Sequence, residues 1–352
     1  MKVTFLNAFN GDSIWISSDI DGRPINILID GGTSTTYSFK DKKDGKEKDG
    51  DLKLLIEDIK SKNESLDLVI LTHIDDDHID GFLKWFSRDK DAVSYIKELW
   101  FNSGRTIKKY LNNQTFQANN LEFKVVSKLT SVAQGVDFEE LVKDNGIWKE
   151  EVIKFGDMLL WHDMLFEILT PNQDKLKSLL ERWEEKDPES TRDTSRKLNN
   201  KKSFNELLKS DSFEEDTNAF NGSSITFILT HNNKKYLFLG DSHPSDVVSG
   251  LQKLGFDNNK KKLVAELVKV SHHGSQKNTS AELLDLIKTD KYVISTNGDK
   301  HDHPDKITIA RILKSNPKAG IYLNYPFLFR NLLIEQDALD YPAASFNSAD
   351  SL

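Results

Sequence analysis

The chain has 352 residues, of which 37% are hydrophobic and 30% charged, a composition typical of globular proteins and unlike that of disordered or membrane-embedded ones. It contains no cysteine, which excludes disulfides, thiol nucleophiles and cysteine-ligated zinc, so a bound metal needs histidine and carboxylate ligands. The net charge of -8 argues against a nonspecific nucleic-acid coat protein but is compatible with a metal-dependent nuclease. No apolar run has the roughly 18 residues of a membrane span, and polar residues interrupt the N-terminus too early for a signal peptide. We therefore expect a cytoplasmic protein without membrane contact.

The N-terminal part reads as a β-hairpin followed by a strand, a helix and a buried strand. Residues 3–17 alternate around a turn at 10–12, and residues 25–29 form a second apolar run that ends at Asp30. We expect a loop over residues 33–52, a helix over 52–59 and a buried strand over 66–71. Several short strands are expected between residues 96 and 170, the last over 164–169.

The second part begins with a strongly charged stretch. Residues 173–217 are expected to be a partly mobile surface insertion with a helix at 174–185 and no core residues from 184 to 216; they could dock a protein partner. Strands over 224–229 and 236–239 precede alternating helices and strands, expected at 245–254, 263–270, 280–288, 292–295, 305–314 and 320–323. This order predicts an α/β fold with two sheets and helices outside them, in one domain of residues 1–330 with a tail at 331–352.

The segment with the clearest chemistry is residues 71–81, which directly follow the buried strand 66–71. Four potential metal ligands fall within six residues there: His73, Asp75, Asp77 and His78. Carboxylates crowded this closely raise one another's pKa unless a cation neutralises them. A divalent metal therefore accounts for the cluster better than a solvated turn does, whereas Asp76 and Asp80 are assigned to the turn itself.

This segment resembles the His-x-His-x-Asp-His motif of the metallo-β-lactamase superfamily, with Asp75 at the second histidine position. The His-x-Asp-x-Asp-His form is similar to the hydrolase domain of ComEC-type DNA-internalisation proteins. Asn7 and Asn10 depart from the Asp and Gln of that family's first motif. The other matching segments, in chain order, are residues 7–13, 29–32, 218–224, 239–241, 271–275 and 301–304. The resemblance implies a metallo-β-lactamase-like αββα sandwich of two mixed sheets.

The resemblance also implies a ligand set for two divalent ions, Zn²⁺ or Mn²⁺. One metal would take the His73 and Asp75 positions and the other Asp77 and His78, with Asp241 bridging both. His273, or else its neighbour His272, and His303 are further candidate ligands or substrate contacts. A superfamily histidine between these motifs has no clear counterpart, because the context of His162 favours a surface turn.

Several nearby residues are candidates for supporting roles. Asp12 and Asp30 could orient ligand histidines, since a metal-bound imidazole usually donates its other N–H to a carboxylate or carbonyl; turn-capping roles are equally compatible with their positions. Ser275 and Lys277 follow the histidine pair, and Lys277 or His273 could contact substrate. His243, close to Asp241, is expected to be exposed.

The resemblance favours a phosphodiesterase, and in particular a nuclease, among the hydrolases. Two divalent metals bring four positive charges, and Asp75, Asp77 and Asp241 bring three negative ones, which suits a singly charged phosphodiester. The metals would lower the pKa of a shared water to roughly 7, and Asp77, His273 and His303 are the residues expected nearest to the reaction. Two alternatives remain open: hydrolysis of a small ester, lactam or cyclic nucleotide, and a non-catalytic metal-bound interaction module.

Overall fold

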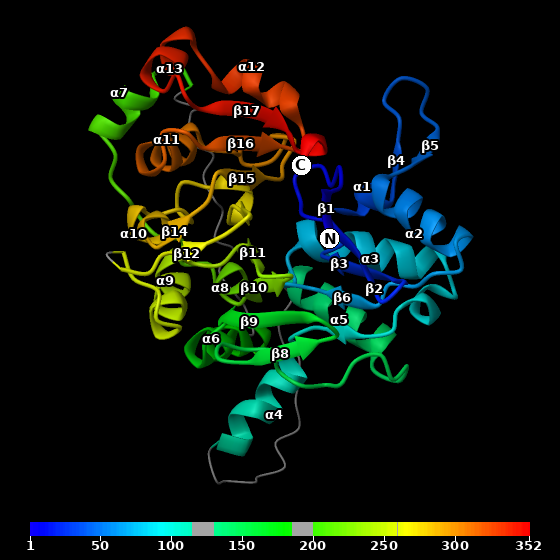
Figure 1. Ribbon diagram of the computed structural model, residues 1–352. Coiled ribbons are helices and arrows are strands. Elements are labelled where there is room, and N and C mark those ends of the chain that lie inside the picture. The colour runs from blue at the N-terminus through cyan, green and yellow to red at the C-terminus, as the bar shows by residue number, and fades with distance from the viewer. Residues whose placement is uncertain (115–129, 185–199, 259) are drawn as a thin grey trace. The chain divides into compact units, whose positions relative to one another are not determined.

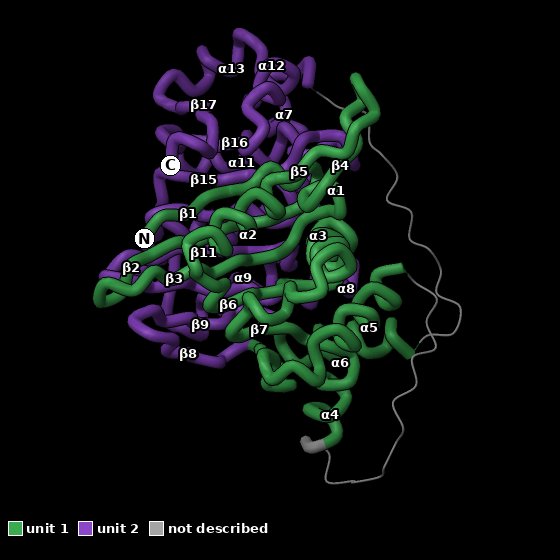
Figure 2. The backbone as a smooth tube through the Cα atoms, turned by 90° about the vertical axis from the view of Figure 1, so that its right-hand side faces the viewer, with its two compact units in different colours: residues 1–154, 171–192 green, residues 155–170, 193–352 purple. Residues whose placement is uncertain are grey.

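A computed structural model of the chain describes residues 1–114, 130–184, 200–258 and 260–352. They form two compact units, shown in separate colours in Figure 2: unit 1 is Met1–Lys154 with Pro171–Arg192, and unit 2 is Phe155–Thr170 with Asp193–Leu352. Each unit contains one main mixed sheet and helices, so the expected α/β class is confirmed. The single domain expected over residues 1–330 stays a prediction. No helix in the described ranges is long and apolar enough to cross a membrane.

Unit 1 is built on a five-stranded sheet. In sheet order its strands are β1 (Lys2–Phe5), β2 (Ile14–Ile20), β3 (Arg23–Ile29), β6 (Leu68–Ile70) and β7 (Leu99–Trp100). β1 and β2 form the expected antiparallel hairpin, in which Val3 lies opposite Ile16. β2 is antiparallel to β3, whereas β3, β6 and β7 run parallel. Every residue of β6 is buried, as expected for a parallel strand covered on both faces.

The polar stretch 33–52, expected to be a loop, contains short regular elements. These are α1 (Ser34–Tyr37), β4 (Ser38–Lys40) and β5 (Glu47–Asp49), and β4 and β5 form a small antiparallel hairpin. Its strands are mostly exposed and charged, so the sequence has no alternating apolar pattern that would predict them. The helix expected next is present as α2 (Asp51–Ser61), which buries Leu52, Leu55, Ile56 and Ile59 at helical spacing.

Residues 96–170 contain two helices where strands were expected. They are α4 (Gly104–Gln114) and α5 (Thr130–Val142), which join α3 (Asp76–Arg88) and the short turn η1 (Ala92–Tyr95) in unit 1. In α5 the buried residues Val132, Gly135, Phe138 and Val142 are three or four positions apart, which is a helical rather than a strand period. Phe138 stacks against Phe86 of α3 at a ring-centroid distance of 5.6 Å.

The start of the expected surface insertion belongs to the core of unit 1. α6 (Gln173–Glu184) buries Leu176, Leu179 and Trp183. A Cβ atom on Gly104 would lie 2.0 Å from the Trp183 ring, so the glycine makes room for the indole. The insertion was inferred from high charge, but α6 is amphipathic and its apolar side is covered. Residues 185–199 of the expected insertion lie outside the described residues.

Unit 2 is built on an eight-stranded sheet, whose strands β17, β16 and β15 lie side by side in Figure 1. In sheet order they are β17 (Ser345–Ser348), β16 (Gly320–Leu323), β15 (Lys291–Ile294), β13 (Leu267–Lys269), β11 (Lys234–Phe238), β10 (Thr226–His231), β9 (Met164–Thr170) and β8 (Met158–Trp161). β8 to β11 pair antiparallel, whereas β11, β13, β15, β16 and β17 run parallel. A separate parallel pair is formed by β12 (Leu263–Val264) and β14 (Ile287–Lys288).

One apolar cluster joins this sheet to its helices. Val248 and Leu251 of α9 pack with Ile309 and Leu313 of α11 and with Ile294 and other residues of the sheet. The helices of unit 2 are α7 (Phe204–Lys209), α8 (Ala219–Gly222), α9 (Pro244–Lys253), α10 (Ala281–Asp285), α11 (Lys306–Ser315), α12 (Phe329–Leu332) and α13 (Glu335–Asp340). Three 3₁₀ turns complete it: η2 (His272–Gly274), η3 (Pro326–Leu328) and η4 (Ala349–Ser351).

The segment 331–352, expected to be a tail, and the end of the expected insertion belong to unit 2. Within residues 331–352, β17 pairs with β16 and α13 carries the buried Asp337. Asp337 pairs with the buried Lys306 Nζ at 2.6 Å and accepts from the Phe204 backbone N–H at 2.8 Å. Phe204 is fully buried, which corrects the expectation of no core residue between 184 and 216. The polar sequence around Phe204 did not predict this burial, because the residues that bury its ring come from elsewhere in the chain.

Candidate metal centre

The His/Asp cluster of unit 1 lies where β6 ends and α3 begins. Asp75 is the N-cap of α3, and Asp76, Asp77 and His78 open its first turn. Acidic side chains are favourable there because the N-terminus of a helix carries partial positive charge. His73, in the loop before the helix, is 3% exposed and His78 is fully buried. Their ring centroids are 4.0 Å apart, so the two imidazoles lie next to each other at the strand-to-helix turn.

Two glycine contacts hold this turn close to its neighbours. A Cβ on Gly81 of α3 would lie 1.9 Å from the backbone oxygen of Gly31, and one on Gly11 would lie 2.0 Å from the backbone oxygen of Asp77. Backbone hydrogen bonds use the space: Gly31 N–H donates to His78 O at 2.7 Å, and Asp12 N–H donates to Asp77 O at 3.1 Å. The glycine motifs at residues 7–13 and 29–32 therefore fix the loops that surround the cluster.

Each histidine of unit 1 has its Nδ1 atom engaged. His78 Nδ1 lies 2.8 Å from Asp30 Oδ2, and His73 Nδ1 lies 3.1 Å from Thr72 Oγ1. Asp30 also accepts from the backbone N–H and the hydroxyl of Thr72, each at 2.7 Å. Burial raises the pKa of Asp30, while His78 and the Thr72 N–H act in the opposite direction. Such a contact with a carboxylate fixes the orientation of an imidazole, so that its Nε2 can bind a metal ion.

The two Nε2 atoms lie opposite carboxylates of the same cluster. His73 Nε2 is 3.8 Å from Asp75 Oδ2, and His78 Nε2 is 3.9 Å from Asp77 Oδ1. These separations are too long for hydrogen bonds. They approach the roughly 3.4 Å between two atoms that are each about 2.1 Å from one tetrahedral ion. The donor set of unit 1 therefore fits a divalent metal.

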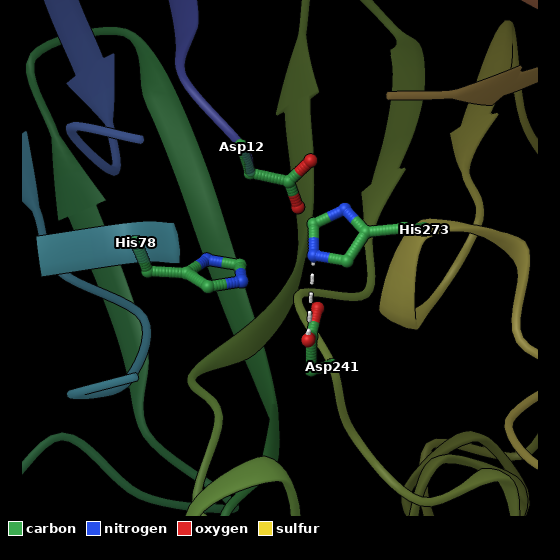
Figure 3. Close-up of side chains that lie close together, drawn as sticks. All are labelled: Asp12, His78, Asp241 and His273. Carbon is green, nitrogen blue, oxygen red and sulfur yellow. Dashed lines mark ion pairs between the residues drawn. The ribbon is translucent and has the colours of Figure 1, made fainter. Parts of the chain in front are cut away.

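Asp12 lies on the ligand side of His78. It is 1% exposed, and one of its carboxylate oxygens lies within 4.8 Å of a ring nitrogen of His78, as drawn in Figure 3. Asp75 and Asp77 are held from outside: Ser131 Oγ donates to Asp75 Oδ1 at 2.8 Å, and Asn10 Nδ2 donates to Asp77 Oδ2 at 3.2 Å. Asn10, one of the departures from the family motif, thus contacts a candidate ligand.

The candidate ligands of unit 2 follow the ends of neighbouring parallel strands. Asp241 comes after β11, His272 and His273 come after β13, and His303 lies in the loop after β15. β11, β13 and β15 run parallel, so their carboxyl ends lie at one edge of the sheet. Open α/β sheets bind ligands at this edge.

His272 and His273 both turn Nε2 toward the same carboxylate. The separations from Asp241 Oδ2 are 3.9 Å for His272 and 3.7 Å for His273, and Figure 3 marks the second with a dashed line. His273 Nδ1 donates to the backbone oxygen of Ser295 at 2.8 Å. Both histidines have positive φ, 47° and 51°, which is costly for residues with a side chain and persists only where the surroundings enforce it. Unit 2 thus shows the same spacing between histidine and carboxylate as unit 1.

His272 stands in a network that sequence reasoning did not find. Its Nδ1 lies 2.9 Å from Asn278 Oδ1 and 3.5 Å from Asp216 Oδ2. Burial by itself would lower the pKa of His272, but attraction to Asp241 and Asp216 raises it to about 9. Burial would likewise raise the pKa of Asp216, but the hydrogen bonds from His272, Asn221 and Asn218 hold it well below its usual range. Asp216 was missed because it ends the charged stretch, where burial was not expected.

Three candidate residues of unit 2 remain. His303 lies beside the histidine pair, whereas Ser275 and Lys277 form the turn that follows it. The His303 ring lies 5.3 Å from that of His272, and its Nδ1 is 3.6 Å from Asp305 Oδ2. Ser275 is buried and its Oγ accepts from the Lys277 backbone N–H at 3.3 Å, so this pair shapes the turn after the histidines.

Two buried side chains change the electrostatics around Asp241. Lys269 was not foreseen: it is 1% exposed, and its Nζ lies 4.0 Å from Asp241 Oδ1 and donates to the Gly240 backbone oxygen at 3.3 Å. His243, expected to be exposed, is 2% exposed. Its two ring nitrogens each lie 3.9 Å from a carboxylate oxygen, one of Asp216 and one of Asp246. It precedes α9 as N-cap, and these carboxylates stabilise it in a buried position.

Comparison with known proteins gives one family match and several similar solved structures. Residues 20–160 match the family model described as the metallo-beta-lactamase superfamily. Among solved structures, the chain is similar to the metallo-beta-lactamase fold protein YhfI from Bacillus subtilis, at 11% identity and a TM-score of 0.41, with 98% of this chain and 95% of that chain covered. It is similar to metallo-beta-lactamase SMB-1 bound to 2-mercaptoethanesulfonate at 9% identity and a TM-score of 0.34, covering 88% and 89%.

A third solved structure, the hydrolase AbOPH in the beta lactamase superfamily, is 12% identical with a TM-score of 0.31 and coverage of 72% and 71%. No curated protein matches the sequence. The family match supports a relationship to the metallo-β-lactamase superfamily, and the mixed α/β fold agrees with it. The closer resemblance to ComEC-type proteins stays a prediction.

Proposed function

We propose that the chain is a metal-dependent phosphodiesterase that uses two divalent ions, Zn²⁺ or Mn²⁺. The observation that carries the proposal is the repeated placement of an imidazole Nε2 between 3.7 and 3.9 Å from a carboxylate oxygen, at the buried His73, His78 and His273 and the half-buried His272. The superfamily supported by the family match consists mostly of metallohydrolases, which favours an enzyme over an interaction module.

The residues themselves define the electrostatic balance. Asp30 and the Ser295 carbonyl hold two of the imidazoles by Nδ1, so no reorientation is needed when a metal binds. Lys269 places a buried positive charge beside Asp241 and compensates part of the carboxylate charge there. Bound divalent metals would supply the activation of a water and stabilise charge that develops on a phosphoryl oxygen. His303, near His272, is a candidate for contacting the substrate phosphate.

A singly charged phosphodiester suits this balance better than a polyphosphate. The candidate ligands Asp75, Asp77 and Asp241 neutralise three of the four positive charges that two metals would bring, and Lys269 adds one more positive charge. The excess is therefore about two positive charges, and about one once a metal-bound hydroxide would be counted, which suits a singly charged substrate. A neutral ester or lactam gains less from it, which is why these remain alternatives to be tested rather than the proposal.

An exposed aromatic ring supports a nucleic acid as the substrate. β16 is parallel to β15, so the turn that follows it lies at the same sheet edge as the His303 loop. Phe327 on this turn is 52% exposed, and its ring centroid is 6.0 Å from that of Tyr325. The adjacent Leu328 packs against Gly298, and so does the His303 backbone oxygen. Exposed aromatic rings beside a phosphodiester site are suited to stacking with bases.

A side-by-side assay tests the proposal. Protein grown with Zn²⁺ and Mn²⁺ is analysed for metal and incubated with DNA, RNA, cyclic dinucleotides, an ester, a lactam and bis-p-nitrophenyl phosphate. We expect one to two metals per chain, phosphodiester cleavage and a lower thermal midpoint after chelation, because metal binding stabilises the folded state. Turnover of the ester or lactam alone would select the alternative hydrolase. Metal binding without any turnover would select the interaction module.

A further inference from the structure

Asp216 connects the stretch before α8 to the loop that follows the histidine pair. Its carboxylate is largely buried, and its backbone N–H donates to the Lys277 oxygen at 3.2 Å. Oδ1 accepts from the Asn218 N–H at 2.9 Å. Oδ2 accepts from Asn221 Nδ2 at 2.7 Å and from Asn278 Nδ2 at 3.2 Å. The carboxylate is therefore surrounded by donors that come from two separate parts of unit 2.

The amide of Asn278 can take only one orientation in these surroundings. Asn278 is fully buried, and its Nδ2 lies near three oxygens that can only accept: Asp216 Oδ2 at 3.2 Å, Asp241 O at 3.1 Å and Ser242 O at 3.3 Å. A flipped amide would set its own oxygen against these acceptors. The three acceptors therefore place the amide nitrogen of Asn278 on their side and its Oδ1 toward His272. Amide orientations are assigned from the hydrogen-bond network in this way.

This orientation determines where His272 carries its proton. Asn278 Oδ1 is an acceptor 2.9 Å from His272 Nδ1, so Nδ1 must be the donor. Asn221 Nδ2 donates one N–H to Asp216 and lies 3.4 Å from His272 Nδ1, farther than Asn278 Oδ1 at 2.9 Å, so the shorter contact decides the role of Nδ1. In a neutral ring the proton on Nδ1 leaves the lone pair on Nε2, the atom that lies 3.9 Å from Asp241 Oδ2.

We propose that Asp216 and Asn278 are positioning residues that keep the His272 proton on Nδ1 and thereby present Nε2 to a divalent metal. The claim that Nε2 of His272 faces a metal rests on the proposed function, whereas the claim about the position of the proton does not. Asp216 acts in two ways: it supplies an acceptor that holds the Asn278 amide in place, and its Oδ2 lies 3.5 Å from His272 Nδ1 itself. His273 has no such relay, since a backbone oxygen holds its Nδ1. Side-chain substitutions can therefore release His272 while His273 stays oriented.

The first test measures Zn²⁺ affinity by competition with a chelator. The variants are Asp216→Asn and Asn278→Ala, and the control is Glu215→Gln, which removes the neighbouring carboxylate that accepts from Ser245 and does not touch His272. We expect about 10- to 100-fold weaker binding in the two variants, the usual effect of losing a residue that orients a metal ligand, and unchanged binding in the control. Wild-type affinity in both folded variants would overturn the proposal. If Asp216→Asn does not fold, as judged by thermal unfolding, Asn278→Ala decides.

The second test needs neither metal nor activity. Long-range ¹H–¹⁵N spectra of the metal-free protein, recorded along a pH titration up to the form in which the His272 ring is neutral, report which ring nitrogen carries the proton. We expect the proton on Nδ1 in wild type and in Glu215→Gln, and a mixture of tautomers in Asn278→Ala. A proton on Nε2 in wild type would overturn the proposal. If wild type binds metal but cleaves no substrate, only the proposed function fails. If wild type binds no metal, the claim that Nε2 of His272 faces a metal fails together with the proposed function. These spectra still decide the position of the proton.

Discussion

The two units hold their candidate ligands in contrasting ways. In unit 1 four of them lie within residues 73–78, at a single strand-to-helix turn. In unit 2 they come from three strand ends, and Asp241 is 62 positions from His303. The first arrangement is a local motif that can be read directly from the sequence. The second exists only because parallel pairing of β11, β13 and β15 gathers their carboxyl ends.

The contrast extends to the contacts that orient the imidazoles. In unit 1 the carboxylate of Asp30 holds His78, whereas in unit 2 the backbone oxygen of Ser295 holds His273. A side-chain acceptor is removed by one substitution, and a backbone acceptor is not. His78 should therefore be sensitive to substitution of the residue that orients it, as His272 is through Asn278, whereas His273 should respond only to changes in itself or in the packing of its strands.

Asp241→Asn should have the greatest effect on activity. Asp241 is the carboxylate near which both His272 and His273 place Nε2, and the change removes its charge with almost no change in shape. We expect phosphodiester cleavage to fall about a thousandfold, or ~4 kcal/mol of transition-state stabilisation, with loss of bound metal. Steady-state kinetics and elemental analysis measure both. Glu266→Gln, an exposed carboxylate of the same unit, is the control. Activity above about a hundredth of wild type would remove Asp241 from the metal centre.

The packing of unit 2 can be tested at the pair Lys306–Asp337, which ties α13 to α11 and to the N-terminus of α7. Asp337→Ala leaves a buried ammonium without its carboxylate and should lower the free energy of unfolding by about 3 kcal/mol. Denaturant titration measures it. The exposed Asp350→Ala, on the same C-terminal segment, should change stability little. Equal stability of Asp337→Ala and wild type would mean that residues 331–352 add nothing to unit 2.

Asp30→Asn compares the two ways of orienting a histidine. Asp30 accepts hydrogen bonds from His78 Nδ1, from the Thr72 backbone N–H and from the Thr72 hydroxyl. The side-chain amide of the variant would offer these three donors only one acceptor atom, its oxygen. Metal affinity should fall by about 10- to 100-fold. Ser295→Ala is the matched change in unit 2, and it should leave affinity unchanged because His273 uses the backbone oxygen. Chelator competition measures both. A loss of affinity in Ser295→Ala as large as in Asp30→Asn would contradict the distinction between His78 and His273.

These features differ in how far sequence could predict them. The hairpin β1–β2, the strand β6 and the cluster after it follow from local periodicity and from adjacent residues, which is why they were expected in place. Asp216 and Asn278 are 62 residues apart and polar, so nothing local indicates that both become buried beside His272. Likewise β17 is a polar strand that exists by pairing with β16. Contacts between distant segments decide such elements, and one sequence does not display them.

The smallest effect is expected at Phe327, where substrate rather than metal is at issue. If its exposed ring stacks on a base, Phe327→Ala should weaken binding of single-stranded DNA by about 1 kcal/mol, a roughly fivefold rise in KM with kcat unchanged. Phe327→Trp should retain the wild-type KM because it keeps an aromatic face. An abasic oligonucleotide of equal length gives the matched substrate: it has the same phosphodiesters without bases, so its KM should not respond to Phe327→Ala. Leu339→Ala, at another exposed apolar side chain of unit 2, controls for surface changes. Equal effects on the normal and abasic strands would assign Phe327 to packing, and base recognition would then have to reside elsewhere.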